Sequence, residues 1–438
     1  MKKMNLYRCF IAIIMLICLS IPVGTILFGT SSAGANEQLA KPPVLINKDG
    51  SFNDGFLSDA MQWFSDHAFL RQEFISLHNL ISAKVFQTSG AEGVVLGKDG
   101  WLFFADTLDD YTGQSAMTDG EISAIANNLA MMNEYVTFKG GKFLFAPIPN
   151  KNSLYPAFMP SAYKMADSGN ARRLMEQLKV LQVPYSDMYA AFSQENEVLY
   201  FAHDSHWNSK GAALGADLIN KGFGVDSSYY FADFSKTSPH MGDLYEMLYP
   251  AFKDSEKDPV YGGTLHFDYT GNGKTPDSIL LKTAGQGSGT LLAYRDSFGN
   301  LLYPYLADTY GDATFSRSVV YDLTQSADYV LVQIVERNLQ YLLANVPIME
   351  SPVREISVPE QASGAISVKT TNYKAPEGYV QLRGHLEADG KIYVVCGGNA
   401  YEAFLLENNG FAVNVPLDAQ PEAVVYTAAD SLMKLTIQ

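Results

Sequence analysis

Two short motifs carry the residues of this sequence that are best suited to chemistry. Residues 204–207 read Asp-Ser-His-Trp, and residues 295–298 read Arg-Asp-Ser-Phe. Together the motifs offer a carboxylate in Asp204, an imidazole in His206 and a hydroxyl in Ser297. These are the three groups of an acyl-transfer site, in which a base activates a hydroxyl nucleophile and a carboxylate orients the base.

The position of each motif fits these roles, but it also fits helix capping. Asp204 and His206 are two residues apart, so on an extended segment their side chains point to the same face. Ser297 is expected at a turn between a strand and a helix, where backbone N–H groups can stabilise an oxyanion. The same turn suits Asp296 and Ser297 as helix N-caps, and residues 204–207 can lead into another helix. Local sequence alone leaves both interpretations open.

A metal site is a weaker interpretation of the same region. His203, Asp204 and His206 place three possible ligands within four residues. An extended segment does not bring all three onto one ion, and His240 and His266 are isolated in the sequence. We therefore expect neither a metal ion nor another cofactor.

The elements that must position these motifs alternate between helices and apolar strands. Strands are predicted at 142–146, 199–202, 289–294 and 329–335, and helices at 171–181, 209–221 and 301–310. This alternation is typical of a parallel sheet covered by helices on both faces, which binds ligands at the carboxyl ends of its strands. Both motifs follow a predicted strand. Residues 223–288 are rich in Gly, Ser and Tyr, and we expect them to form a lid or a wall of the site.

The N-terminal residues predict export from the cytoplasm. A basic start is followed by uncharged, mostly apolar residues from Cys9 to Gly29, a run just long enough to span a bilayer. Residues 1–35 are therefore expected to be a signal peptide or a membrane anchor, and 33–35 (Ala-Gly-Ala) resemble a cleavage site. In either case the body of the protein is expected outside the cytoplasm, tethered to the membrane or secreted.

The rest of the chain is expected to form a linker and two domains. Residues 36–53 are small and polar, as in a linker. Residues 54–350 are expected to be the catalytic domain, beginning with a helical pattern, a strand–turn–strand signal around 98–100 and a capping box at 118–121. Residues 351–438 predict a small β-sandwich. Polysaccharide binding and a structural or interaction role are both open for it.

Composition restricts the partners and the covalent chemistry. The formal net charge of -16 disfavours nucleic acid and other polyanions and favours a neutral or weakly charged ligand. Of the three cysteines, Cys9 and Cys18 lie in the N-terminal apolar run, so the remaining chain has no pair for an internal disulfide. We expect Cys396 to be a buried apolar residue.

Several segments, in the same order, resemble the bacterial DHHW proteins, which are related to the alginate O-acetyltransferases of the AlgJ and AlgX type. The main ones are Asp-x-His-Trp at 204–207 and Asp-Ser-Phe-Gly-Asn at 296–300. Weaker ones are the helical lead-in, the early hairpin, the segment after the first core strand and a late motif, at 66–71, 97–103, 147–160 and 336–337. The resemblance implies an SGNH-hydrolase-like three-layer α/β sandwich with a parallel sheet, to which the C-terminal all-β sandwich is added.

The resemblance also implies a reaction. A triad of Ser297, His206 and Asp204 would form a covalent acyl-serine and pass an acetyl group to a polysaccharide hydroxyl or to water. A membrane acyltransferase that supplies acetyl groups is the implied partner. The alternative is a non-catalytic SGNH-like protein that binds glycan or acts as a scaffold in polysaccharide export or modification.

Four further residues are candidates for the surroundings of the site. Arg295 stands where the related proteins usually have glycine, so it either reaches the substrate or braces the turn. Asn150 and Lys151 follow a predicted strand and are candidates for binding the oxyanion. Trp207 is expected to pack against the ring of His206 and to hold it in place.

Overall fold

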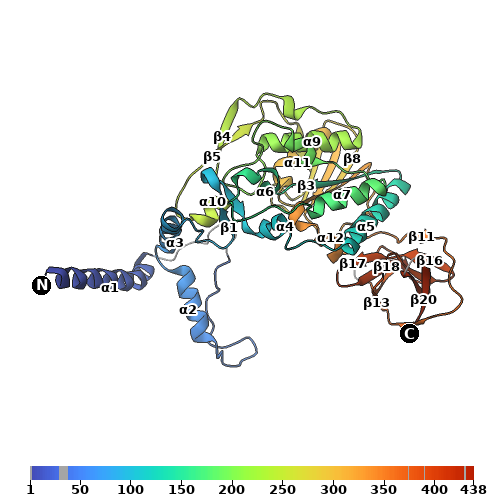
Figure 1. Ribbon diagram of the computed structural model, residues 1–438, viewed down its shortest axis with the longest axis horizontal. Coiled ribbons are helices and arrows are strands. Elements are labelled where there is room, and N and C mark those ends of the chain that lie inside the picture. Colours follow the sequence, from blue (N-terminus) through green and yellow to red (C-terminus); the bar gives the residue numbers. More distant parts are fainter. Residues whose placement is uncertain (1, 29–37, 373, 389, 429–430) are drawn as a thin grey trace.

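The computed structural model describes residues 2–28, 38–372, 374–388, 390–428 and 431–438 (Figure 1). The 33–35 segment that resembles a cleavage site lies outside these residues. Helix α1 (Lys2–Phe28) extends from the rest of the molecule at the N-terminal end (Figure 1). In the described part of the chain, no helix has the combined length and hydropathy expected of a membrane span.

Two helices and a β-hairpin lead from α1 into the body of the protein. Helices α2 (Phe56–His67) and α3 (Arg71–Ile81) agree with the helical pattern predicted after residue 54. Strands β1 (Val94–Leu96) and β2 (Leu102–Phe104) pair antiparallel, which confirms the predicted strand–turn–strand. Shorter helical turns in this part of the chain are η1 (Ser82–Phe86), η2 (Lys98–Gly100), η3 (Ala105–Thr107) and α4 (Leu108–Thr112).

A six-stranded sheet forms the centre of the molecule, in the order β3-β10-β8-β9-β7-β6. The first four strands are parallel and are buried along most of their length, as continuous apolar sequences predict. The last two pair antiparallel at the edge, so the predicted parallel sheet is correct for the core and incomplete at this edge. In sheet order the strands are Lys142–Ile148, Tyr329–Val335, Thr290–Tyr294, Asp312–Ser316, Leu280–Gly285 and Phe267–Tyr269.

Helices cover both faces of this sheet and complete the expected three-layer sandwich (Figure 1). Helices α5 (Asp119–Phe138) and α7 (Asn170–Val180) cover one face, and the predicted capping box of Thr118 and Glu121 opens α5. Helices α9 (Ser209–Phe223) and α11 (Gly299–Thr309) cover the other face. Short helices in the connections are α6 (Lys151–Leu154), η4 (Pro156–Phe158), α8 (Met188–Ser193), η6 (Glu336–Asn338) and α12 (Tyr341–Ala344).

The predicted strand at 199–202 is wrong. Tyr200 forms only an isolated bridge with Trp207, and the N–H of Phe201 donates to the carbonyl of His206. The segment therefore closes on itself as a loop beside the sheet, and its other backbone groups bind the Tyr155 hydroxyl, the Glu256 carboxylate and the Leu102 N–H of β2. The strand that lies beside β8 in the sheet is β9 (Asp312–Ser316), which was not predicted from the sequence.

The Gly-, Ser- and Tyr-rich segment after α9 is more regular than expected. After a turn, η5 (Tyr229–Phe231), strands β4 (Lys236–His240) and β5 (Glu256–Val260) pair antiparallel, with helix α10 (Asp243–Leu248) between them. Glu256 accepts hydrogen bonds from two backbone N–H groups of the loop that precedes His206. This insertion therefore packs against the histidine loop as a wall.

Two packed sheets make up the C-terminal part, in the orders β11-β16-β15-β19-β20-β12 and β13-β14-β18-β17. Apolar side chains of both sheets, among them Val394 and Val413, share one core, which confirms the predicted β-sandwich. Cys396 is 1% exposed, as expected. From β11 to β20 the strands are Val353–Arg354, Gly364–Ile366, Lys369–Thr371, Tyr379–His385, Ile392–Cys396, Asn399–Glu402, Phe404–Leu406, Gly410–Pro416, Pro421–Ala428 and Ser431–Ile437.

Candidate active site

His206 lies between Ser297 and Asp204 in the structure. His206 Nε2 is 2.8 Å from Ser297 Oγ, and His206 Nδ1 is 2.7 Å from Asp204 Oδ1. Both distances are hydrogen-bonding distances, so one imidazole links the hydroxyl to the carboxylate. The tautomer that fits carries its proton on Nδ1, directed at Asp204, which leaves Nε2 free to accept from the Ser297 hydroxyl. The structure thus brings together the three residues that the sequence singled out.

Asp204 is a buried carboxylate held by four donors. Oδ1 accepts from Nδ1 and from the backbone N–H of His206, and Oδ2 accepts from His240 Nε2 at 2.9 Å and from the Asp243 N–H at 3.1 Å. Burial raises the pKa of this carboxyl, but the hydrogen bonds from His206 and His240 lower it more, so the net pKa lies well below its usual range. Asp204 is therefore ionised at neutral pH and can stabilise a positive charge on His206.

His240 is not isolated, as the sequence suggested, but shares Asp204 with His206. It ends strand β4, and its ring stacks on Phe201 with ring centroids 3.9 Å apart. Burial lowers its pKa, whereas the hydrogen bond to Asp204 and the charge of Asp204 raise it, with a net rise. No local pattern marks this residue, because 36 positions separate it from Asp204 in the chain.

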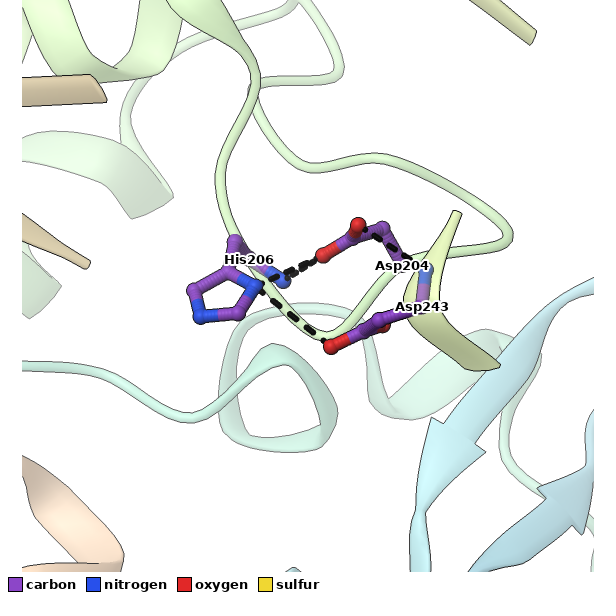
Figure 2. A group of neighbouring side chains, drawn as sticks. All are labelled: Asp204, His206 and Asp243. Atoms are coloured by element: carbon purple, nitrogen blue, oxygen red, sulfur yellow. Dashed lines mark hydrogen bonds and ion pairs between the residues drawn. The ribbon is translucent and has the colours of Figure 1, made fainter. Parts of the chain in front are cut away.

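Asp243 places a second carboxylate beside His206, as Figure 2 shows. Its Oδ2 is 3.6 Å from His206 Nδ1, which is too long for a hydrogen bond but close enough for charge attraction. Its two oxygens accept from the backbone N–H of Ser205 at 2.8 Å and from the Ser205 hydroxyl at 2.6 Å. Burial, and then the charge of Asp204, raise the pKa of Asp243. No local sequence pattern marks Asp243, which orients Ser205 and acts on His206.

The pKa of His206 results from opposed effects. Burial lowers it, whereas the hydrogen bond to Asp204 and the charges of Asp204 and Asp243 raise it. The net effect is a rise above the ordinary histidine value. The imidazole is therefore a stronger base than free histidine, and it holds a proton taken from Ser297 more firmly.

Lys151 lies beneath the loop that carries His206. Its ammonium group donates to the carbonyls of Phe201, Ala202 and Asp204 at 3.0, 3.0 and 2.7 Å. The residue is 4% exposed, and burial lowers its pKa to about 7. All three donor hydrogens are used within the loop, so Lys151 fixes the shape of this loop rather than binding the oxyanion.

Trp207 connects the two motifs. Its indole N–H donates to the carbonyl of Phe298 at 3.1 Å, and its ring meets the Phe298 ring edge-on. Gly215 allows this packing, because a Cβ at that position would lie 2.9 Å from the indole. The ring that lies against His206 is that of Phe298, at a centroid distance of 4.8 Å. Trp207 therefore does not pack on the ring of His206 as expected, but acts on it indirectly through Phe298.

Ser297 lies in the turn between β8 and α11, which agrees with the predicted strand-to-helix turn. The carboxylate of Asp296 fixes this turn by accepting from the Phe298 N–H, the Gln333 side chain and the Val335 N–H. The last two residues belong to β10, so the turn is tied to the neighbouring strand. In the described part of the chain the Ser297 N–H has no acceptor, and it is available to bind an oxyanion.

Arg295 and Asn150 are bound to the scaffold. The Arg295 guanidinium donates to Asn300 Oδ1 at 2.7 Å and to the Pro276 carbonyl at 2.6 Å, so it braces the turn. Asn150 is fully buried, and its Nδ2 donates to Asp110 at 2.9 Å. Neither side chain therefore takes the substrate-binding or oxyanion position considered from the sequence.

Arg337 brings a positive charge to the same end of the sheet. Its guanidinium lies 5.3 Å from the centroid of the Phe104 ring and 5.9 Å from that of the Phe298 ring. The charge of Arg337 lowers the pKa of His206, an effect that falls off with distance. Arg337 lies in η6, which directly follows β10, and together with Glu336 it forms the late motif of the DHHW resemblance.

Asp204, His206 and Asp243 also offer possible metal ligands (Figure 2). Their ligand atoms lie within 4.8 Å of one another, and they form the one candidate metal group among the described residues. This group includes Asp243 in place of the His203 that the sequence offered. His203 instead packs its ring against Tyr245, at a centroid distance of 5.5 Å. A bound ion would have to displace the hydrogen bonds that Asp204 and His206 already make.

Residues 94–260 match the model of the family described as "SGNH hydrolase-like domain, acetyltransferase AlgX". The matched region contains Asp204, His206, His240 and Asp243, and it ends before Ser297. The family match therefore covers the histidine loop and the wall that packs against it.

Curated relatives include the probable alginate O-acetylases AlgJ of two pseudomonads. The protein of Pseudomonas syringae pv. tomato is 24% identical over 238 residues, which are 50% of this chain and 55% of that protein. The protein of Pseudomonas aeruginosa is 24% identical over 230 residues, which are 50% of this chain and 54% of that protein. The chain thus spans about half the length of these relatives.

Solved structures with some similarity include a DHHW family protein from Eubacterium siraeum and the O-acetyltransferase domain of Pseudomonas putida AlgJ. The first is 18% identical to this protein, and the alignment covers 58% of this chain and 99% of the Eubacterium siraeum chain, with a TM-score of 0.41. The second is also 18% identical, and the alignment covers 56% of this chain and 92% of the Pseudomonas putida chain, with a TM-score of 0.38. The AlgX-type match over residues 94–260 and the AlgJ relatives agree with the resemblance to AlgJ- and AlgX-type SGNH hydrolase-like proteins that the sequence motifs indicate.

Proposed function

We propose that this protein is an extracytoplasmic O-acyltransferase or acetylesterase that acts on a polysaccharide through Ser297, His206 and Asp204. The observation that carries the proposal is that His206 lies within hydrogen-bonding distance of both Ser297 and Asp204. A hydroxyl nucleophile, a base and an orienting carboxylate then have the arrangement that acyl transfer needs. The match to the AlgX acetyltransferase domain supports the same class of reaction.

In the first half of the proposed reaction, Ser297 Oγ attacks the carbonyl carbon of an acetyl ester while His206 Nε2 takes the hydroxyl proton. The carbonyl electron pair moves onto oxygen, and the Ser297 N–H stabilises the resulting oxyanion. The bond to the alcohol oxygen of the donor then breaks, and His206 gives its proton to that oxygen. Asp204 stabilises the imidazolium while it exists. The products are acetyl-Ser297 and the free alcohol of the donor.

In the second half, a hydroxyl of the acceptor attacks the carbonyl of acetyl-Ser297 while His206 takes its proton. When the bond between Ser297 Oγ and the carbonyl carbon breaks, His206 returns the proton to Ser297. A sugar hydroxyl as acceptor gives an O-acetylated polysaccharide, and water gives acetate. Exclusion of water from the closed site decides between these outcomes.

The sequence also implies a location, a domain division and partners for this reaction. The signal peptide or membrane anchor at residues 1–35 stays a prediction, as does the division into 36–53, 54–350 and 351–438. A membrane acyltransferase would supply the acetyl groups, and an extracellular or cell-surface polysaccharide would accept them. The AlgJ relatives are named as alginate O-acetylases. For this protein we propose a polysaccharide substrate of unspecified type.

Ser297→Ala tests the proposed nucleophile. The wild-type protein should release acetate from 4-nitrophenyl acetate, and the variant should turn over at least about 10³-fold more slowly, because no hydroxyl remains to be acylated. Ser288→Ala is a matched control, since Ser288 is exposed in the turn before β8. Turnover by Ser297→Ala at the wild-type rate would overturn the proposal.

A fluorophosphonate probe separates this proposal from the alternative of a non-catalytic glycan-binding or scaffold protein. The probe reacts with an activated serine, so we expect a covalent adduct on the peptide that contains Ser297 and none on that peptide after denaturation. Mass spectrometry of the digested protein locates the adduct. A folded protein that binds glycan and leaves Ser297 unlabelled would favour the non-catalytic alternative.

A further inference from the structure

A cavity of about 260 Å³ lies at the carboxyl end of β3 and against the first turns of α7. Sites for drug-sized ligands occupy about 300–1,000 Å³, so this cavity suits a single ring. Its walls are largely apolar, and the triad residues are not among them. The side chains that matter below are Asp110, Asp167, Arg172, Met175, Tyr189 and Glu336.

Glu336 has one carboxylate oxygen bound to the protein and one directed at the cavity. Its Oε2 accepts from the Asn150 N–H at 2.9 Å and from the Ser153 hydroxyl at 2.8 Å. In the described part of the chain Oε1 has no donor, and it faces Gly169, another wall residue, where a Cβ would lie 3.5 Å away. A ligand hydroxyl can therefore bind Glu336 without displacing an existing hydrogen bond.

Asn150 connects the cavity to the triad. On the cavity side its backbone N–H binds Glu336 and its Nδ2 binds Asp110. On the other side its Oδ1 is 3.5 Å from the guanidinium of Arg337, which lies against the ring of Phe298. The cavity and the nucleophile turn thus lie on opposite sides of Asn150 and Arg337.

The charges around the cavity favour a neutral ligand. Asp110 and Asp167 are wall residues whose carboxylates repel an anionic group such as a uronate. Arg172 opposes a cationic ligand, and its guanidinium lies 5.9 Å from the centroid of the Tyr189 ring. A sugar ring without charge fits these walls, since its hydroxyl edge can meet Glu336 while its C–H face lies on the apolar side chains.

We infer that this cavity is a subsite for a neutral sugar ring, a hexose or N-acetylhexosamine unit of the acceptor polysaccharide. The inference rests on the proposed function, because it takes the acceptor to be a polysaccharide. It narrows that function to polymers with a neutral unit near the position that is acetylated.

The protonation of Glu336 supports a neutral partner. Burial, and then the charge of Asp110, raise the pKa of the Glu336 carboxyl to about 7. Near neutral pH a large fraction of this carboxyl is therefore protonated, and it can both donate and accept a hydrogen bond. Sugar hydroxyls have the same double capacity.

Met175→Trp tests the subsite on the full chain. Met175 is half-buried in the cavity wall, and an indole at this position fills the space for a sugar ring. Gln177→Trp is a matched control, because Gln177 is exposed on the same helix and is not a wall residue. Calorimetry with cellotetraose, the N-acetylglucosamine tetramer and tetragalacturonate measures the affinities, and circular dichroism checks that each variant is folded.

We expect the wild type and Gln177→Trp to bind at least one neutral tetramer, and Met175→Trp to bind it at least about tenfold more weakly. Tetragalacturonate should bind none of the three proteins. Equal affinity of Met175→Trp and wild type, equal binding of the uronate, or no binding of either neutral tetramer by the wild type would overturn the inference.

Ser297→Ala separates the inference from the proposed function. This variant should lose acetate release and still bind the neutral tetramer as the wild type does. If the wild type binds no sugar while its acetate release depends on Ser297, the subsite is wrong and the proposed reaction stands. If Ser297→Ala releases acetate normally, the proposed reaction is wrong whatever the sugar affinity.

Discussion

His206 and Ser297 lie 91 positions apart in the chain, yet His206 Nε2 is 2.8 Å from Ser297 Oγ. The two residues come from different parts of the fold, a loop beside the sheet and the turn after β8. The next residues along each segment, Trp207 and Phe298, bind each other through the indole N–H and the Phe298 carbonyl. The distance between base and nucleophile therefore depends on the contact between their neighbours.

Trp207→Phe should loosen this contact. The variant keeps an aromatic ring but loses the indole hydrogen bond to Phe298, which leaves a buried carbonyl without its donor. We expect the free energy of unfolding to fall by about 1–3 kcal/mol and turnover to fall more than the lost stability alone explains. Urea unfolding and 4-nitrophenyl acetate hydrolysis measure the two effects. Trp63→Phe on α2 is the control, and equal turnover in both variants would contradict the expected link between Trp207 and the site.

Asp204→Asn should reduce turnover by about 10³- to 10⁴-fold, because the amide neither stabilises the imidazolium nor selects the tautomer with the proton on Nδ1. Labelling of Ser297 by the fluorophosphonate should slow in parallel. Asp254→Asn, at an exposed position in the same insertion as Asp243, is the control. A variant at Asp204 that keeps wild-type turnover would remove this carboxylate from the proposed triad.

The rate should depend on pH through His206. Its pKa is raised, and only the neutral imidazole can accept the Ser297 proton, so kcat/KM should rise with pH and level off above the ordinary histidine value of about 6.5. Asp243→Asn removes a charge that raises this pKa and should move the acid limb to lower pH. This assignment would be contradicted if the apparent pKa of the acid limb of kcat/KM in the wild type lay at or below the ordinary histidine pKa. It would also be contradicted if Asp243→Asn left that apparent pKa unchanged.

Stability should depend on pH through His240. The pKa of His240 is raised in the folded protein, so its interaction with Asp204 is fully stabilising below the ordinary histidine pKa and is lost as pH rises through the raised value. The free energy of unfolding should therefore fall across this range more steeply in the wild type than in His240→Gln. Chemical unfolding at several pH values measures the slopes. Identical slopes would mean that His240 does not gain protons on folding.

Chelation separates the triad from a metal-dependent reaction at Asp204, His206 and Asp243. The triad needs no ion, so prolonged dialysis against EDTA or dipicolinate should leave acetate release unchanged. A loss of activity that Zn²⁺ restores would instead favour the metal-dependent reaction, since these three residues offer ligand atoms within 4.8 Å of one another.

The sequence was informative about the core because apolar runs and caps are local signals. Strands β3, β8 and β10 are nearly continuous apolar segments, and the Thr118 capping box marks the start of α5, so their residues alone identify them. The 199–202 segment has the same apolar character, but its backbone bonds partly within its own loop and partly to Leu102 and to side chains, and it joins none of the described sheets. Apolar sequence predicts burial, and pairing with a neighbouring strand is a separate property that depends on the rest of the fold.

The types and order of the chemical residues were determined by the sequence, because hydroxyl, imidazole and carboxylate groups are visible in Ser297, His206 and Asp204 without any structure. Only the tertiary structure decided what surrounds them. His240 and Asp243 reach Asp204 and His206 from an insertion more than thirty positions away, and the side chains of Lys151, Arg295 and Asn150 turn out to donate hydrogen bonds to the scaffold. Such contacts depend on distances between segments that are remote in the chain, which packing sets and local sequence does not encode.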